Sequence, residues 1–301
     1  MSHSGIFCSL RTLLPFRSLP GLLLLIALAP AQAAPVRLVV QNEAHLAHAR
    51  ALVLAAFEAG GLEVQPDDAP IGNERRVQSL MDSRQIHVSM IPASAERLQL
   101  VKEGKLLMIP VPLDRGLLGY RIGLTVNSRR DAMAQVRTSA DLKNIIIGQG
   151  EGWSDLDIYH HAGIPTHEIK DWTQDVFARQ IDAGVMDLYP VGLVETFNYF
   201  LDHYRQLYAE VTLEPYLIIR YPWFRFVWVT ADLPHVHAVL ERGFERLIES
   251  GEFLRIWEQH RQAPSEAMLA GRTIIDLANP YYSLEVIPAH WRHLLIRPLQ
   301  K

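Results

Sequence analysis

Residues 36–61 read VRLVVQNEAHLAHARALVLAAFEAGG, and this stretch decides the fold of the chain. Its first five residues are apolar except for Arg37, which predicts a short buried strand. The residues after it repeat apolar side chains at helical spacing and stop at Gly60-Gly61. That helical face comprises Leu46, Val53, Leu54 and Phe57. A buried strand that leads into an amphipathic helix is the first half of a βαβ unit, from which α/β proteins are built.

The alternation of strand and helix continues outward from this stretch. Further strands are predicted at 62–65 and 87–91, with one helix after the cap residue Asn73 and another at 94–101. A second series follows the apolar residues 106–111. In chain order it comprises an extended run at 117–126, strands at 145–147, 167–169 and 186–189, and helices that begin near Ser154 or Asp155, near Thr173 and at 191–207. Two extended stretches come next, and the remainder is predicted to be mostly helical: 217–220 and 224–230, then 235–249, 252–260 and 265–269.

These two series predict an α/β protein of two lobes, each with a mainly parallel sheet flanked by helices. The chain crosses between the lobes twice, near 118–126 and near 217–230. We expect lobe 1 to comprise residues 36–122 and 223–301, and lobe 2 to comprise residues 123–222. Two lobes joined by two hinge strands can close over a ligand, because ligands bind in clefts between domains.

The charge of the chain argues against nucleic-acid binding. Lys and Arg number 29 against 33 Asp and Glu, which gives a formal net charge of −4. No basic block is present, and phosphate binding requires clustered Lys and Arg. The apolar share of 49% and the charged share of 21% are those of an ordinary globular protein, which we expect to be a monomer.

The first 33 residues have the layout of a secretory signal peptide, and in a bacterium this predicts a periplasmic protein. Arg11 and Arg17 precede the apolar run 19–29, and residues 31–33 (AQA) form a small-x-small cleavage site. The alternative is an uncleaved membrane anchor, although the run is shorter than the roughly 20 apolar residues of a bilayer span. Cys8, the single cysteine, precedes the run, so the mature chain would lack disulfides, thiolate nucleophiles and cysteine metal ligands.

Three local motifs, in their order along the chain, resemble those of the type II periplasmic solute-binding proteins of family 3, the amino-acid-binding class. They are Leu142-Lys143 before 145–148, the step 181–187 (IDAGVMD) and the stretch 248–257 (IESGEFLRIW). A group of stand-alone members is the closer match, through 116–121 (GLLGYR), 148–155 (GQGEGWSD), Tyr221-Pro222 and Asn279-Pro280. The resemblance covers nearly the whole mature chain and implies a two-lobed, periplasmic-binding-protein-like type II fold with two hinge strands.

The resemblance also implies ligand-binding residues. In the amino-acid binders an Arg after the third strand of lobe 1 pairs with the ligand carboxylate, and Arg97 matches it in position and in chemistry. Gly150, Gly152 and Ser154 match a turn in lobe 2 whose N–H groups and hydroxyl contact the ligand. The family's Asp for the ligand amine has no counterpart, because no acid precedes Glu195 in the equivalent stretch. This departure argues against an ordinary α-amino acid as the ligand.

Three further residues are candidates for the cleft. Arg121 lies in the first crossing, where it either faces the cleft or pairs with an acid and stiffens the hinge. Trp153 either stacks on the ligand or covers the lobe core. Tyr221, with the aromatic residues that follow it, either walls the cleft or packs at the hinge. The loop 148–152 is GxGxG and lacks the lysine of a P-loop, so its glycines are expected to bring the backbone close to a solute.

Residues that could form a metal or catalytic site have simpler interpretations. Asp155 is interpreted as a helix cap, and Glu195 either as an acid or base or as part of a solvated helix face. The histidines, of which there are 13, lack an HExxH pattern and are interpreted as surface residues in their closest pairs, 45/48, 160/161 and 235/237. No GxSxG motif is present. We therefore predict no catalytic residue, no metal and no cofactor.

The leading hypothesis is an exported solute-binding protein that captures a small polar or anionic solute, amino-acid-like or a carboxylate, by hinge closure. Its partner would be an ABC permease or a membrane sensor. Two alternatives are an enzyme on the same scaffold, similar to the periplasmic dehydratases among the family's relatives, and a ligand-sensing module of a membrane signalling partner. A cleft carboxylate or histidine with a strongly shifted pKa would favour the enzyme.

Overall fold

The computed structural model describes residues 35–69, 72–260 and 269–296. The predicted signal peptide, residues 1–33, lies outside the described residues, as does nearly all of the helix predicted at 265–269. Within the described ranges, no helix combines the length and the apolar character that a bilayer span requires.

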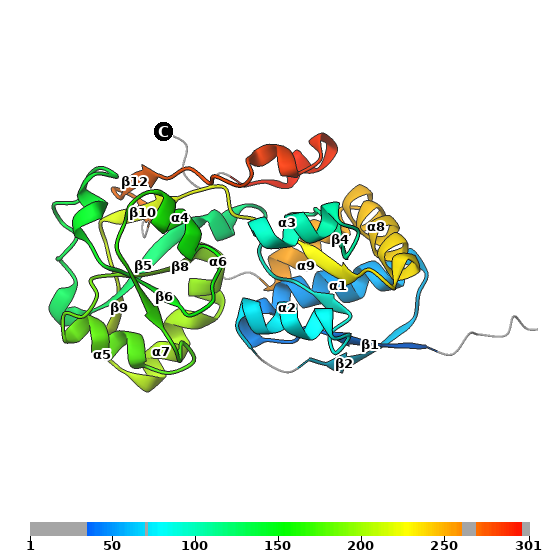
Figure 1. Ribbon diagram of the computed structural model, residues 1–301, viewed down its shortest axis with the longest axis horizontal. Coiled ribbons are helices and arrows are strands. Elements are labelled where there is room, and N and C mark those ends of the chain that lie inside the picture. Colours follow the sequence, from blue (N-terminus) through cyan, green and yellow to red (C-terminus); the bar gives the residue numbers. More distant parts are fainter. Residues whose placement is uncertain (1–34, 70–71, 261–268, 297–301) are drawn as a thin grey trace, which may run out of the picture. The chain divides into compact units, whose positions relative to one another are not determined.

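The first sheet has five strands in the order β2-β1-β3-β11-β4 (Figure 1). They are β1 (Val36–Val40), β2 (Val64–Asp68), β3 (Val88–Ser89), β4 (Leu106–Ile109) and β11 (Val227–Thr230). Strand β1 pairs in parallel with β2 and β3, as the sequence predicts, whereas β11 pairs antiparallel with β3 and β4. The late strand β11 therefore completes a sheet that the N-terminal strands begin.

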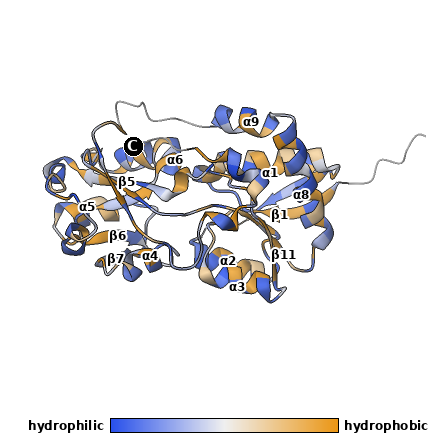
Figure 2. Cartoon of the chain, turned by 90° about the horizontal axis from the view of Figure 1, so that it is seen from above, coloured by the Kyte–Doolittle hydropathy of each residue, from blue (hydrophilic) through white to orange (hydrophobic). Residues whose placement is uncertain are grey.

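Five helices flank the first sheet: α1 (Ala47–Gly60), α2 (Glu74–Asp82), α3 (Ala95–Lys102), α8 (Pro234–Glu249) and α9 (Glu252–His260). The predicted ends of the early helices are confirmed. Helix α1 ends at Gly60 and is capped by Gly61, whose φ of 86° is left-handed, and the Asn73 side chain caps α2 by accepting from the Arg76 N–H. Helices α1 and α8 pack so closely that a Cβ on Gly243 would lie 1.8 Å from the carbonyl oxygen of Ala56. Figure 2 shows that α8 and α9 each carry a hydrophobic and a hydrophilic face.

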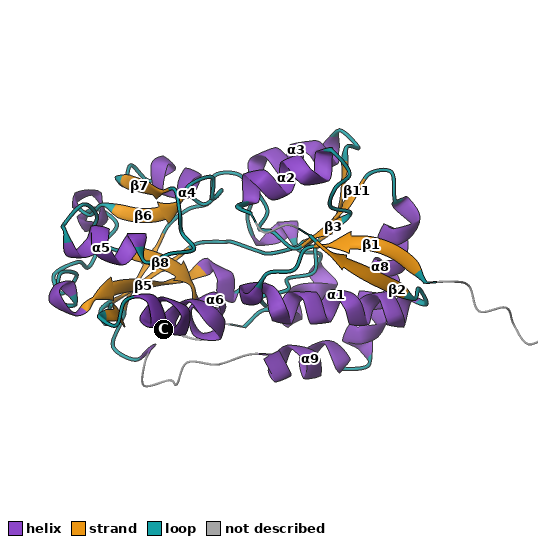
Figure 3. Ribbon diagram, turned by 90° about the horizontal axis from the view of Figure 1, so that it is seen from below, coloured by secondary structure: helices purple, strands orange, loops and turns teal. Residues whose placement is uncertain are grey.

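The second sheet is built from β5 (Tyr120–Val126), β8 (Tyr189–Gly192), β9 (Val211–Leu213), β10 (Leu217–Arg220) and β12 (Thr273–Asp276). A separate parallel pair, β6 (Ile147–Gly150) and β7 (Thr166–Ile169), joins β8 through a bridge between Ile147 and Leu188 (Figure 3). The helices of this part are α4 (Leu156–His161), α5 (Val176–Asp182), α6 (Leu193–Glu195) and α7 (Leu201–Leu207), with a π-helical turn, Thr196–Phe200, between the last two.

The two predicted crossings lie side by side. Ile219 pairs antiparallel with Arg121, and Arg220 with Tyr120. The N–H of Tyr221 also donates to the carbonyl oxygen of Gly119 at 3.1 Å. The expected α/β architecture of sheets flanked by helices is confirmed, but the second sheet differs in detail from the mainly parallel sheet that we predict. Strand β5 pairs antiparallel with β8, β9 and β10, because the chain runs outward in β5 and returns in the other crossing strand.

Four local predictions are wrong. Strand β12 is not among the predicted elements of the mostly helical C-terminal stretch, because it forms by pairing with β10, which is distant in the sequence. Gly148 and Gly150 are in β6 instead of in a loop. Thr173 does not cap α5, since its N–H and hydroxyl both donate to Asp171. Strand β8 begins at Tyr189 instead of at residue 186, because pairing with β5 starts there.

The close approach of the two crossing strands generates a prediction about Gly119. A Cβ at this position would lie 2.2 Å from the carbonyl oxygen of Tyr221, so Gly119→Ala must push the strands apart. We expect a loss of about 1–3 kcal/mol in the free energy of unfolding, measured by urea denaturation. Gly251→Ala is the matched control, because its φ is 79° but no atom lies near its Cβ position, so only backbone strain of about 1 kcal/mol applies. A smaller loss for Gly119→Ala than for the control would contradict the close approach.

Candidate functional site

A small cavity lies where the loops after the strands of both sheets converge. Its wall comprises Gln41, Glu43, His45, Gly72, Asn73, Glu74, Ile91, Pro92, Leu118, Arg121, Trp153, Asp155, Trp172, Glu195, Phe200, Trp223 and Arg225. The space open to water among them is about 50 Å³, far below the roughly 300 Å³ at which small-molecule pockets begin. The cleft is therefore nearly closed, and a ligand larger than a few waters requires its walls to separate.

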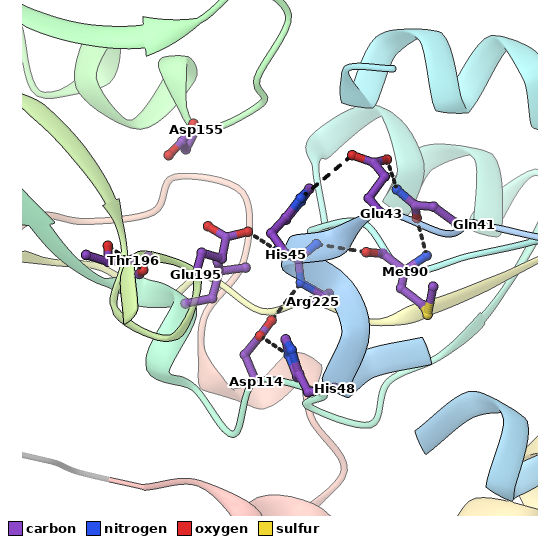
Figure 4. Close-up of polar contacts among 12 residues, drawn as sticks. Gln41, Glu43, His45, His48, Met90, Asp114, Asp155, Glu195, Thr196 and Arg225 are labelled. Atoms are coloured by element: carbon purple, nitrogen blue, oxygen red, sulfur yellow. Dashed lines mark hydrogen bonds and ion pairs between the residues drawn. The ribbon is translucent and has the colours of Figure 1, made fainter. Parts of the chain in front are cut away.

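Arg225 is the centre of a buried ion cluster (Figure 4). Its Nε donates to Asp114 Oδ2 at 2.8 Å, its Nη1 donates to the carbonyl oxygen of Met90 at 2.8 Å, and its Nη2 donates to Glu195. His48 Nε2 lies 2.6 Å from the second oxygen of Asp114. Burial alone would raise the pKa of Asp114, but the charges of Arg225 and His48 outweigh it and hold that pKa at about 2. Asp114 is therefore ionised at neutral pH.

Glu195 and His48 differ from their sequence interpretations. Glu195 is buried against Arg225, so it is not part of a solvated helix face. Burial raises its pKa, and the attraction of Arg225 offsets this only in part. His48 is 1% exposed and bonded to Asp114, so it is not a surface histidine. Helix periodicity placed His48 on α1 but could not show that Asp114, distant in the sequence, would meet it.

Arg121 and Asp155 form a second buried pair. Arg121 Nη2 lies 2.7 Å from Asp155 Oδ2, and the Tyr221 hydroxyl donates to the same oxygen at 2.9 Å. Both interpretations of Arg121 therefore hold, because it lines the cavity and also pairs with an acid. Asp155 occupies the N-cap position of α4, but its side chain makes no cap hydrogen bond. The predicted capping role is wrong because the buried guanidinium binds this carboxylate instead.

Glu43 is the acid of the cleft that lacks a cationic partner. Its Oε1 accepts from Gln41 Nε2 at 2.8 Å, and Gln41 is itself fixed by the Met90 N–H. Its Oε2 lies 3.8 Å from His45 Nδ1, but burial lowers the pKa of His45 to about 3, so this ring is neutral at pH 7. Among the described residues no other cation lies within ion-pair distance of Glu43. Burial accordingly raises the pKa of this carboxyl group.

Arg97 is buried, so it is not a solvated surface charge, and its Nε and Nη2 groups are already hydrogen-bonded. Its Nε donates to the carbonyl oxygen of Pro92, and its Nη2 lies 2.7 Å from both Glu74 Oε2 and Ser154 Oγ. The Ser154 hydroxyl also donates to Glu74. Arg97, Gly152, Trp153 and Ser154 border a neighbouring hollow, and of these four only Trp153 lines the main cavity.

The remaining predicted residues are partly assembled at the cleft. Trp153 lines the cavity and also lies over Gly150, where a Cβ would be 2.5 Å from the indole ring. Tyr221 is outside the cavity wall and acts on it through Asp155, whereas its neighbour Trp223 is in the wall. Direct ligand contact by any of these residues stays a prediction. Within the part of the chain that the structure describes, no group of three or more His, Cys, Asp or Glu residues is arranged to hold a metal ion.

Several cleft residues escape sequence reasoning, namely Gln41, Glu43, His45, Glu74, Trp172 and Arg225. One signal could have found the first three. They directly follow the first predicted strand, and ligands in α/β proteins bind beyond the carboxyl ends of such strands. Arg225 and Trp172 carry no comparable local signal.

Comparison with known proteins was made by family, by sequence and by structure. No protein-family model matches the chain, and no curated protein matches it. Several solved structures, by contrast, match the chain. The GluR0 ligand-binding core in complex with L-glutamate aligns with a TM-score of 0.57 at 12% identity, over 76% of this chain and 99% of that one. The chain has the two-lobed fold of amino-acid-binding periplasmic proteins. The resemblance predicted from its sequence motifs is thereby confirmed at the level of the fold.

Two further solved structures extend this comparison. An amino acid ABC transporter substrate-binding protein from Streptococcus pneumoniae, bound to L-arginine, aligns with a TM-score of 0.54 at 11% identity, over 76% of this chain and 95% of that one. The VFT2 domain of Bordetella pertussis BvgS, a double mutant, has the same TM-score and identity, over 75% of this chain and 93% of that one. Identities this low establish the fold alone.

The buried cluster generates a prediction about Arg225. Arg225→Gln leaves Asp114 and Glu195 buried without their cation, so the free energy of unfolding should fall by about 3–5 kcal/mol in urea denaturation. Arg37→Gln is the matched control, because Arg37 pairs with Asp67 in solvent and its side chain is 68% exposed. That control should leave stability nearly unchanged. Equal effects of the two substitutions would contradict the role given to the cluster.

The isolation of Glu43 predicts a pH dependence. A carboxyl group whose pKa is raised on folding stabilises the protein at low pH, and this contribution is lost as pH rises through the raised pKa. Glu43→Gln retains an acceptor for Gln41 but cannot ionise. We expect the variant to match the wild-type stability near pH 4.5 and to exceed it by about 1–3 kcal/mol at pH 8, measured by urea denaturation.

The control for this pH experiment is Glu245→Gln, which alters an exposed acid on α8. This variant should have nearly the stability of the wild type at both pH values, because the side chain is exposed to solvent. A Glu43→Gln variant that is less stable than the wild type at pH 8 would show that Glu43 has a compensating partner.

Proposed function

We propose that this chain is a solute-binding protein that captures a small polar molecule in the cleft by closing two lobes around it. The main support is the cavity itself. Charged and aromatic side chains from the loops after both sheets line it, and it lies next to the paired strands β5 and β10, at which the chain crosses between the sheets. Binding a ligand to residues of both halves stabilises the closed state, because only that state makes all of the contacts.

The proposed lobes are residues 36–122 with 223–301, and residues 123–222. Sheet membership supports this division, because β1 to β4 and β11 form one sheet, whereas β5, β8, β9 and β10 belong to the other. Strand β12 is an exception, since it lies within 223–301 but pairs with β10. It would tie the C-terminal part of lobe 1 to lobe 2.

We further propose that the protein is exported and that a membrane partner, either an ABC permease or a sensor, recognises its closed, ligand-bound form. The layout of residues 1–33 supports export, and the S. pneumoniae structure is a substrate-binding protein of an ABC transporter. Uptake and sensing share the same first step, which is ligand-driven closure. The shifted pKa values of Glu43, His45, Asp155 and Glu195 meet the condition set above for an enzyme, but burial is the main cause of each shift and requires no catalytic role.

The test is thermal shift of the purified protein against a library of amino acids, amines, organic acids and sugars, with calorimetry on each solute that stabilises it. We expect at least one solute to bind with one-to-one stoichiometry and to raise the melting temperature. Trp172→Ala, in the cavity wall, should weaken that binding at least tenfold. Tyr281→Ala removes an exposed aromatic ring that does not line the cavity and should leave binding intact. Stabilisation by no solute would contradict the proposed function.

A further inference from the structure

We infer that the ligand of this cleft is an organic cation without a carboxylate group, such as an amine, a guanidinium or a quaternary ammonium compound. The inference rests on the proposed function and narrows it to one chemical class. Three features of the described residues carry it: the charge balance of the cavity, the aromatic groups in its wall, and the occupant of the position that would receive a ligand carboxylate.

The charge balance of the cleft has an excess of acid. Four acids line the cavity, Glu43, Glu74, Asp155 and Glu195, against the two cations Arg121 and Arg225. Glu74 has its own partner in Arg97, but Arg225 must also compensate the ionised Asp114. His48 shares the compensation of Asp114, so two arginines and one histidine face four acids, namely Asp114, Asp155, Glu195 and Glu43. A bound cation would supply the missing positive charge, whereas a bound anion would add to the deficit.

Glu43 marks where the cation would bind. Its side chain is 5% exposed and lies in the cavity wall, and its Oε2 accepts no hydrogen bond from any described residue. The ligand cation would form an ion pair with Oε2 of Glu43. The aromatic residues of the same wall, Trp153, Trp172, Phe200 and Trp223, can stabilise a desolvated cation through their ring faces. Trp153 and Trp172 adjoin one another, with ring centroids 5.8 Å apart.

The position for a ligand carboxylate is filled by the protein itself. The resemblance assigns Arg97 to the ligand carboxylate and the Ser154 hydroxyl to contact with the ligand, and both groups bind the carboxylate of Glu74. Glu74 and Arg97 come from α2 and α3, which flank the same sheet, so their pairing does not depend on closure of the cleft. Glu74 therefore occupies this position in the open state as well. A ligand that carries a carboxylate would have to displace a partly buried, charge-assisted interaction.

Calorimetry with three matched pairs of probes tests the inference: agmatine and arginine, cadaverine and lysine, and choline and betaine. Each pair shares a cationic group, and only the second member carries a carboxylate. We expect at least one carboxylate-free cation to bind the full chain at least tenfold more tightly than its partner. Glu43→Gln should weaken that binding at least tenfold.

The same calorimetry on Glu74→Ala tests whether carboxylate-bearing probes gain affinity. Removing this carboxylate frees Arg97 and Ser154, so the preference should move at least tenfold toward the carboxylate-bearing member of the pair. Glu245→Ala, on the exposed face of α8, is the control and should not move it.

The outcomes separate this inference from the proposed function. Tighter binding of arginine, lysine or betaine than of its partner overturns the inference and leaves the proposed function standing. An unchanged preference in Glu74→Ala overturns it as well. If all six probes fail to bind while a neutral or anionic solute of the library does, the inference also falls. If no solute binds at all, the proposed function itself is contradicted.

Discussion

The burial of one guanidinium, that of Arg225, is the constraint on which the cleft depends. It is 3% exposed, and it can remain charged there because Asp114, Glu195 and the carbonyl oxygen of Met90 surround it. His48, on α1, holds the far side of Asp114, and Glu195 ends the helix that follows β8. One side chain therefore ties the core of the first sheet to a helix of the second, and it fixes the cavity wall between them.

The need to neutralise buried charges also determines which ligands the cleft can bind. The cations of the wall are used by the acids already present, so Glu43 is left to be neutralised by a proton or by a ligand. Arg97, the residue type that would select a carboxylate, is held by Glu74 and Ser154. Solved structures with this fold include complexes with L-glutamate and with L-arginine, both of which carry the carboxylate group that our inference excludes from the ligand of this cleft.

The sequence predicted the local features of the fold well, because their signals are local. Asn73 and Gly61 act where a cap and a helix stop were expected, and β1 and α1 follow the apolar pattern of residues 36–61. Strand β12 was missed because its identity comes from pairing with β10. The cavity wall shows the same difference between local and long-range signals. Sequence motifs pointed to Arg121 and Trp153, whereas Arg225 and Trp172 join the wall only because folding brings distant segments together. The burial of Asp155 likewise changed its role from helix cap to ion-pair partner.

The titration of Glu43 is the most direct measurement of the central claim, which is that the cleft holds an uncompensated acid for a cationic ligand. Carbon-13 NMR of the Glu43 carboxyl group across pH reports it, with Glu43→Gln used to assign the signal. Without ligand, the pKa of Glu43 should lie above the ordinary value of 4.5, and saturating amine ligand should lower it. A pKa at or below the ordinary value in the free protein, or one that the bound amine leaves unchanged, would contradict the account.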